Sequence, residues 1–231
     1  IINGKVNQSY LLKKGDILDI LTTVKSNYGY LSVEGGFKIK KEFDSFSTLT
    51  ISKIGANKGE KISNNQNIYI NNNGSNKKSI INRNSKEEVG VKEKIIRVIP
   101  GPQMNYFFQK TINNFFTKKF EISYQSNRMG IRLEKNMCKA VKSHNIPSEG
   151  IIKGSIQIPG DGSPIVLLND HPTIGGYPKI ATVILTDINK IAQLPRGSSF
   201  LFELVTITEA ENIYIKSMME INEKIKNINY I

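Results

Sequence analysis

PSEGIIKGSIQIPGDGSPIVLLNDHPTIGGYPKIATVILT, residues 147–186, is the stretch that decides the fold. Short runs rich in β-branched residues alternate in it with clusters of Gly, Pro and Asp, a pattern typical of β-strands joined by tight turns. The runs are Ile151-Ile152, Ser155–Ile158, Ile165–Leu168 and Ile180–Leu185, and the turns are Pro159-Gly160-Asp161-Gly162 and Gly175-Gly176-Tyr177-Pro178. Most of the polar side chains lie near the turns, as expected where a rigid scaffold holds a functional site on its loops.

Further strands are predicted on both sides of this stretch. They are Ile17–Thr22, Tyr28–Val33, Leu49–Ile51, Ile68–Ile70, Lys94–Ile99, Phe120–Tyr124, Ile131–Leu133 and Phe200–Leu204. Residues 64–84 are Asn-rich and poor in large apolar groups, a composition that predicts an irregular connection around the strand at Ile68–Ile70.

Two segments have the periodicity of helices instead. Within residues 103–117, Phe108, Ile112 and Phe115 recur at intervals of four and three, which predicts a helix packed on a sheet. Near the end of the chain, Thr206 and Glu209 form a capping box for a terminal helix. Its apolar stripe is Tyr214, Met218, Ile221, Ile225 and Ile228. We favour docking of this stripe on the same chain over pairing with another, because about two heptads are short for an independent coiled coil.

Composition sets the broad class. A chain of 231 residues with 39% hydrophobic and 8% aromatic residues suits one large or two modest globular domains. The single cysteine, Cys138, excludes an internal disulfide and fits a reducing compartment, so we expect a cytoplasmic protein. No apolar run reaches the roughly 18 residues of a spanning helix, and no membrane association is expected.

The net charge of +12 raises the question of nucleic-acid binding. The lysines are scattered singly or in pairs, and no helix-turn-helix, zinc-ligand or RNP-like pattern accompanies them. We therefore predict no specific nucleic-acid partner. A basic face would equally attract an acidic partner protein or an anionic substrate.

Several reaction classes lack their sequence motifs. Phosphate-loop, GxGxxG, HExxH, CxxC and GxSxG patterns are all absent. The two histidines, His144 and His171, have no ligand-like partner at helical spacing, so a metal site is not expected. What is left is a set of carboxylates and amides.

Each member of this set has a structural alternative. Glu149 would suit a general base if burial raised its pKa, or it is a solvated or hydrogen-bonded loop acid. Arg128 presents a planar fork that fits a carboxylate or phosphate, or it forms a structural salt bridge. Asp170 lies in a polar segment, Asn169-Asp170-His171, which comes after an apolar strand and just before the Gly-Gly turn. Asp161 belongs to an Asp-Gly pair, the commonest hairpin-turn dipeptide.

Two further residues have equally open interpretations. Gln157 alternates with core residues of its strand, so it faces away from them and is either exposed or lines a barrel cleft. Tyr177 either hydrogen-bonds a ligand or closes its turn.

Three blocks in order carry a family resemblance. The first is Arg97-Val-Ile-Pro-Gly-Pro-Gln103, the second Ser126-Asn-Arg-Met-Gly-Ile-Arg-Leu-Glu134, and the third runs from Ser148 to Val183. With Ile191-Ala-Gln-Leu194 after them, they resemble the biotin-dependent carboxyltransferase (allophanate hydrolase subunit 2) family. That family includes KipA and the C subunit of bacterial ATP-dependent 5-oxoprolinase.

The resemblance implies a mainly β fold of two cyclophilin-like β-barrel domains with a few helices. We expect a first barrel at residues 1–93 that lacks its usual N-terminal segment, a second barrel at residues 94–210 and a C-terminal helix at 211–231. Two positions depart from the family pattern. Phe46 stands in place of an arginine, and His171-Pro172 stands where relatives usually have Arg-Gln.

The resemblance also implies a function. The chain is expected to act as a C-subunit-like component of ATP-dependent 5-oxoprolinase, with a KipI-like B subunit and an A-type subunit, on 5-oxoproline, whose amide ring is opened to glutamate. The alternatives are transfer of a carboxyl group from carboxybiotin to urea or a similar amide, or a non-catalytic, KipA-like binding role. ATP would act in the complex with the partner, and any biotin would arrive on a separate protein. The implied site comprises Arg128, Glu149 and Asp170 as catalytic candidates and Gln157, Asp161, Thr173, Gly175, Gly176 and Tyr177 as substrate-binding candidates.

Overall fold

The computed structural model describes residues 9–23, 25–71, 94–135, 137–140 and 142–226. These residues fall into two compact units. Residues 12–28 and 94–226 belong to the larger unit, and residues 9–11 and 29–71 belong to the smaller one. The larger unit carries all the candidate site residues.

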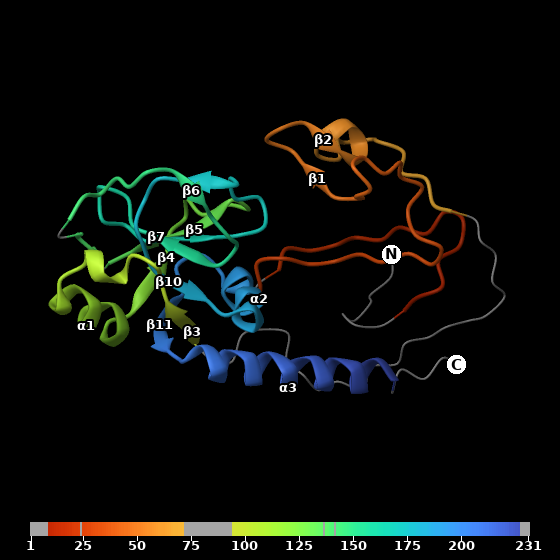
Figure 1. The fold of residues 1–231 in the computed structure, drawn as a ribbon. Helices are drawn as coiled ribbons and strands as arrows, with labels where there is room; N and C mark the ends of the chain where they lie inside the picture. The colour runs from red at the N-terminus through yellow and green to blue at the C-terminus, as the bar shows by residue number, and fades with distance from the viewer. Residues whose placement is uncertain (1–8, 24, 72–93, 136, 141, 227–231) are drawn as a thin grey trace. The chain divides into compact units, whose positions relative to one another are not determined.

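The larger unit is built on a closed β-barrel (Figure 1). Its strands are β3 (Ile95–Pro100), β4 (Phe120–Ile122), β5 (Gly130–Glu134), β7 (Ser155–Gln157), β8 (Ile165–Leu167), β10 (Lys179–Val183) and β11 (Ser199–Leu204). Around the barrel the order is β10-β3-β11-β4-β5-β8-β7. All neighbours are antiparallel except β11 and β3, which are parallel. Closure leaves no unpaired sheet edge, and the predicted mainly β fold with a barrel is confirmed.

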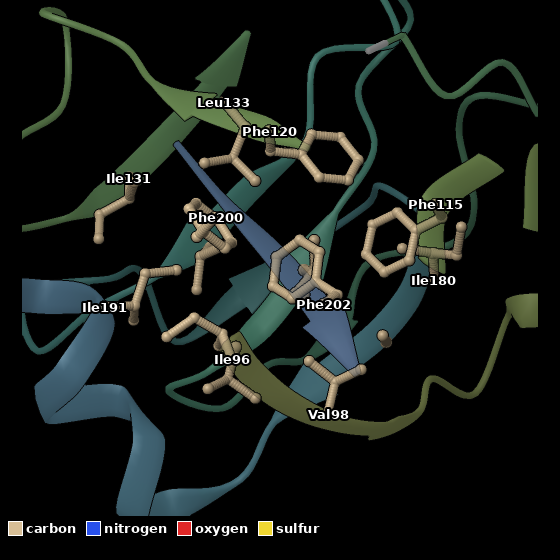
Figure 2. Close-up of a cluster of buried hydrophobic side chains, with 14 of the residues drawn as sticks. Ile96, Val98, Phe115, Phe120, Ile131, Leu133, Ile180, Ile191, Phe200 and Phe202 are labelled. Atoms are coloured by element: carbon tan, nitrogen blue, oxygen red, sulfur yellow. The ribbon is translucent and has the colours of Figure 1, made fainter. Parts of the chain in front are cut away.

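The barrel interior is filled by aliphatic and phenylalanine side chains (Figure 2). Phe115 lies stacked on Phe202 with ring centroids 4.7 Å apart, and Phe200 meets Phe202 edge-on at 5.0 Å. Phe115 comes from helix α1 (Gln109–Thr117), which packs against the barrel through Phe115 and Ile112 as the periodicity predicted. Phe108, the third residue of the predicted stripe, precedes the helix and is exposed, so its predicted packing is wrong. A short 3₁₀ turn, η2 (Met104–Tyr106), precedes α1.

Helix α2 (Leu185–Gln193) was not predicted, and the strand expected at Ile180–Leu185 ends at Val183. Ile184, Ile188 and Ile191 recur at four and three and are buried. The β-branched run continues across the strand–helix boundary, so composition alone gives no sign of where the strand stops.

A buried ion pair holds α2 against β3. The Arg97 backbone N–H and Nε each donate to Asp187 Oδ2 at 2.9 Å, and Nη2 donates to Oδ1 at 2.6 Å. Lys190 Nζ lies 3.2 Å from the same carboxylate. Burial of Asp187 acts to raise its pKa, but the hydrogen bonds from Arg97 outweigh it and hold the pKa below its usual value.

The strands predicted at Ile17–Thr22 and Tyr28–Val33 are wrong. Neither segment is part of a β-ladder in the described chain, and apolar side chains such as Leu21 and Tyr30 are exposed. A strand needs the backbone groups of a neighbour, which an alternating sequence cannot supply by itself. The end of α2 holds Asn27 and Tyr28 instead, through the Gln193 side chain.

The smaller unit has little regular structure. It contains the two-residue strands β1 (Thr48–Leu49) and β2 (Ile54–Gly55), a 3₁₀ segment η1 (Ala56–Gly59) and isolated bridges between Phe37 and Ile70 and between Glu42 and Ser45. The predicted strands Leu49–Ile51 and Ile68–Ile70 are thus reduced to one residue each. Residues 64–67 are irregular as expected, and the rest of the Asn-rich stretch beyond Asn71 lies outside the described residues.

The terminal helix α3 (Ile207–Lys226) begins at the predicted capping box. The Glu209 backbone N–H donates to Thr206 Oγ1 at 3.2 Å, and the Thr206 backbone N–H donates to Glu209 Oε2 at 2.7 Å. The expected docking of its apolar stripe is wrong: α3 contacts α2, but none of its described side chains is buried. Ile228 lies outside the described residues. None of the helices in the described ranges has the length and apolarity needed to cross a membrane.

Candidate functional site

A two-stranded ribbon brings two of the sequence motifs together. Strand β6 (Glu149–Gly150) pairs antiparallel with β9 (Ile174–Gly175), so that Glu149 lies opposite Gly175. The ribbon is extended at both ends, because Ile151 N–H donates to the Thr173 carbonyl and Ile146 N–H donates to the Gly176 carbonyl. The strand predicted at Ile151-Ile152 is therefore displaced, since the ladder strand ends at Gly150.

The ribbon covers Gln157 on the outer wall of the barrel. Ile156 and Ile158, on either side of it, are completely buried in the core, so Gln157 faces outward as predicted. It is nevertheless only 6% exposed, because Gly175 lies against it. A Cβ at position 175 would lie 2.5 Å from Gln157 Nε2, so a side chain there would displace the Gln157 amide from its present position.

Lys179 is a residue whose importance the sequence did not reveal. It lies opposite Gln157 in the β7–β10 pairing, and side chains of directly paired residues project to the same face. Lys179 is only 3% exposed, and its ammonium forms an ion pair with Glu149 Oε1. A lysine at the start of an apolar strand directly after a Gly-Gly-Tyr-Pro turn was the available signal.

Gln103 completes this group. Its Nε2 donates to Glu149 Oε1 at 2.9 Å, and its Oε1 accepts the Lys179 backbone N–H at 3.1 Å. We call Gln103, Glu149, Gln157 and Lys179 the ribbon cluster. Within the described part of the chain, Gln157 Nε2 has no hydrogen-bond partner, and Lys179 Nζ has only the Glu149 carboxylate. Buried polar groups are rarely left in this state, so the cluster is unusual.

The electrostatics of Glu149 oppose one of its predicted roles. Hydrogen bonds from Lys179 and then from Gln103 hold its pKa below the usual value, and the side chain is 43% exposed. Glu149 is therefore ionised at neutral pH. Of its two predicted interpretations, general base or hydrogen-bonded loop acid, the structure matches the loop acid. A base whose pKa is raised by burial is not what the structure contains at this position.

Arg128 and Asp170 form a second, separate group. Arg128 Nε and Nη2 lie 2.8 Å and 3.1 Å from the two Asp170 oxygens, and the Asp170 backbone N–H donates to the Arg128 carbonyl. This bidentate pair joins the Ser-Asn-Arg-Met-Gly loop to the end of β8. The fork of Arg128 is thus used within the protein, although its side chain is about half exposed.

Asp161 lies in a third group with Arg132. The Gly162 N–H donates to the Pro159 carbonyl at 2.9 Å, which closes the predicted turn, and Gly162 has a φ of +79°. The Asp161 carboxylate accepts the Ser163 N–H and an Arg132 N–H, each at 2.9 Å. These bonds, the Ser163 backbone bond first, lower the pKa of Asp161. This geometry matches the turn-forming interpretation.

The described residues show no hydrogen bond or ion pair that joins these three groups. Thr173 and Gly176 contribute backbone carbonyls to the ribbon, and the partly exposed Tyr177 follows it. Throughout the same residues there is no group of three His, Cys, Asp or Glu side chains that would hold a metal ion. The ribbon cluster, with Gly175 above it, is the best-defined candidate site.

Comparison with known proteins defines the class. Residues 2–204 match the family described as "Carboxyltransferase domain, subdomain A and B", and the chain belongs to this family. Among curated proteins, the chain is 34% identical over 203 residues to the C subunit of 5-oxoprolinase from Escherichia coli, with 86% of this chain and 63% of that protein covered. It is 26% identical over 234 residues to the urea amidolyase of Saccharomyces cerevisiae, which covers 90% of this chain and 12% of that protein.

A solved structure supports the fold. The crystal structure of the Kluyveromyces lactis urea carboxylase superposes with a TM-score of 0.69 at 21% identity, over 86% of this chain and 19% of that chain. The family expected from the sequence motifs is confirmed.

Proposed function

We propose that this chain is the C-subunit-like component of an ATP-dependent 5-oxoprolinase, which opens the cyclic amide of 5-oxoproline to glutamate. It acts with a KipI-like B subunit and an A-type subunit. The support is the similarity to the C subunit of the Escherichia coli 5-oxoprolinase, of which this chain spans 63%. ATP binds in the complex with the partner, because this sequence has no phosphate loop.

The observation that carries the proposal is the ribbon cluster. A buried ammonium, together with a buried amide N–H that has no partner among the described residues, is suited to bind an anionic oxygen. The substrate carries a carboxylate, and its amide oxygen gains negative charge when the ring carbonyl is attacked. Lys179 and Gln157 are therefore the donors that this chain offers, and Gln103 and Gly175 hold them in place.

The test is 5-oxoproline-dependent ATP hydrolysis by the three-component mixture. The chain is mixed with cognate A-type and B-type subunits, and the control omits the chain. The Escherichia coli protein, with its own partners, is the positive control. Turnover that disappears when the chain is omitted supports the proposal. No turnover, with the positive control active, would instead indicate the non-catalytic binding role.

A second candidate is carboxyl transfer from carboxybiotin to urea, with biotin on a separate protein. The relative named urea amidolyase favours it. The two substrates differ in charge, since urea is neutral and 5-oxoproline is an anion. A buried lysine contributes more to binding an anion than to binding a neutral amide, so the ribbon cluster favours 5-oxoproline.

A further inference from the structure

We infer that Gln103, Gln157 and Lys179 of the ribbon cluster form a carboxylate-binding site that Glu149 occupies in the free chain, and that the carboxylate of a small ligand binds by replacing Glu149. This inference rests on the proposed function for the identity of the ligand, 5-oxoproline. It assigns the contacts of the ligand carboxylate to Lys179, Gln103 and Gln157.

The donors of the ribbon cluster converge from three separate places. Lys179 comes from β10, Gln157 from β7, and Gln103 from the loop after β3. Lys179 and Gln103 both contact the same oxygen, Glu149 Oε1. These donors form a binding site for a carboxylate, and in this structure the carboxylate of Glu149 is bound there.

The two charges of the cluster differ in burial. The Lys179 side chain is 4% exposed, whereas that of Glu149 is 43% exposed. The cation is thus fixed in the wall, and the anion reaches it from the solvent side. The Glu149 carboxylate is already partly solvated, so its movement into water costs it little. The movement leaves Lys179 as a buried ammonium without a counter-ion, and a second carboxylate would restore that counter-ion.

The cluster also contains an unused donor. Gln157 Nε2 is buried with no partner among the described residues, and it belongs to the residue directly paired with Lys179. A carboxylate has two oxygens, each able to accept hydrogen bonds, but Lys179 and Gln103 both contact Oε1 of Glu149. A free ligand carboxylate is not tethered to β6, so its second oxygen is able to satisfy Gln157.

A matched pair of ligands tests the inference on the unmodified chain. 5-Oxoproline and 2-pyrrolidinone share the lactam ring and differ in the carboxylate. Calorimetry and amide NMR shifts of the full 231-residue chain should show binding of 5-oxoproline and at least tenfold weaker binding of 2-pyrrolidinone, since hydrogen bonds to a charged group contribute about one to two factors of ten. Equal binding of the two, or binding of neither, overturns the inference.

Two variants test the replacement of Glu149. Glu149→Gln removes the competing charge with little change in shape, and it should tighten 5-oxoproline binding by roughly tenfold. Lys179→Met should abolish the preference for 5-oxoproline over 2-pyrrolidinone. The matched control is Glu121→Gln, which neutralises another Lys–Glu pair of the barrel, that with Lys135, and should leave binding unchanged. Weaker binding in Glu149→Gln would show that Glu149 contacts the ligand directly, and would overturn the inference.

The inference and the proposed function fail in different ways. The proposed function fails if the complex acts on another anionic amide. In that case 5-oxoproline does not stimulate ATP hydrolysis, but the chain still prefers 5-oxoproline over 2-pyrrolidinone in a way that depends on Lys179. If the ribbon cluster is purely structural, turnover will be present while neither variant changes the preference between the two ligands.

Discussion

The buried pair of Arg97 and Asp187 gives a sharp prediction about stability. Asp187 is completely buried in the first turn of α2 and accepts three hydrogen bonds from Arg97 on β3. Replacing Asp187 with Asn keeps the shape but removes the charge and presents an NH₂ group to a guanidinium. We expect this single change to destabilise the barrel strongly.

The magnitude follows from what is left behind. Removing one partner of a buried ion pair costs about 3–5 kcal/mol, because the other charge is stranded. Arg97 retains 24% side-chain exposure and is able to reach some water, so the lower end, about 3 kcal/mol, applies. With a urea dependence of about 2 kcal/mol per M, the unfolding midpoint should fall by about 1.5 M.

The assay is equilibrium urea unfolding followed by far-UV circular dichroism, because the chain has no tryptophan. The control is Arg132→Ala, which breaks the solvent-exposed pair with Asp161 and should cost less than about 1 kcal/mol. Equal losses of stability in Asp187→Asn and Arg132→Ala would refute the argument from burial.

The pH dependence gives an independent check. The folded-state pKa of Asp187 is lowered, so its contribution to stability is present above the unfolded pKa of about 3.9 and is lost as pH falls through the folded pKa. The stability difference between the unmodified chain and Asp187→Asn should be constant from about pH 6 to 8 and shrink below about pH 4. A difference that does not change with pH would mean that the carboxylate charge is unimportant.

Three further predictions concern the core, the thiol and the terminal helix. Phe202→Ala should cost about 3–5 kcal/mol in urea unfolding, because Phe202 is 2% exposed and packs against three other rings, whereas Phe108→Ala, at a 59% exposed position, should cost far less. Burial raises the pKa of the Cys138 thiol to about 12, so Ellman's reagent at pH 8 should react only when urea unfolds the barrel; rapid reaction of the folded chain would contradict this. Thr206→Ala removes the capping hydroxyl of α3 and should cost about 1 kcal/mol, with faster amide exchange in the first turn, while Thr208→Ala serves as the control inside the helix.

The features that the sequence predicted correctly depend on local chemistry. Strands β3 and β7 belong to short runs rich in β-branched residues that end at a Pro-Gly pair, and those signals act within a few residues. The capping box at Thr206 and Glu209 is equally local. Helix α2 has local signals as well, in the spacing of Ile184, Ile188 and Ile191. They were obscured because the same residues extend a run that suits a strand.

The composition of the ribbon cluster depends on pairings between distant residues. Gln157 was placed correctly on the outward face of its strand by alternation, but its burial comes from Gly175, which β6–β9 pairing brings over it. Lys179 is buried with its ammonium paired to the distant Glu149, in a strand pattern where a lysine would ordinarily be taken as exposed. Strand formation at Ile17–Thr22 and Tyr28–Val33 would likewise need neighbouring strands, and the tertiary structure decides whether these are present.

Two ion pairs of the barrel, each with one buried partner, differ in a way that separates structure from function. In the pair of Arg97 and Asp187, the buried carboxylate is held by three well-formed hydrogen bonds, which is how a buried charge is stabilised for folding. In the pair of Lys179 and Glu149, the buried ammonium relies on one half-exposed carboxylate, and the amide beside it has no partner in the described chain. Stable folding alone would favour satisfying these groups or replacing them with apolar residues. Because proteins tend to break such rules where they bind or react with something, the second pair is the one that should respond to a ligand.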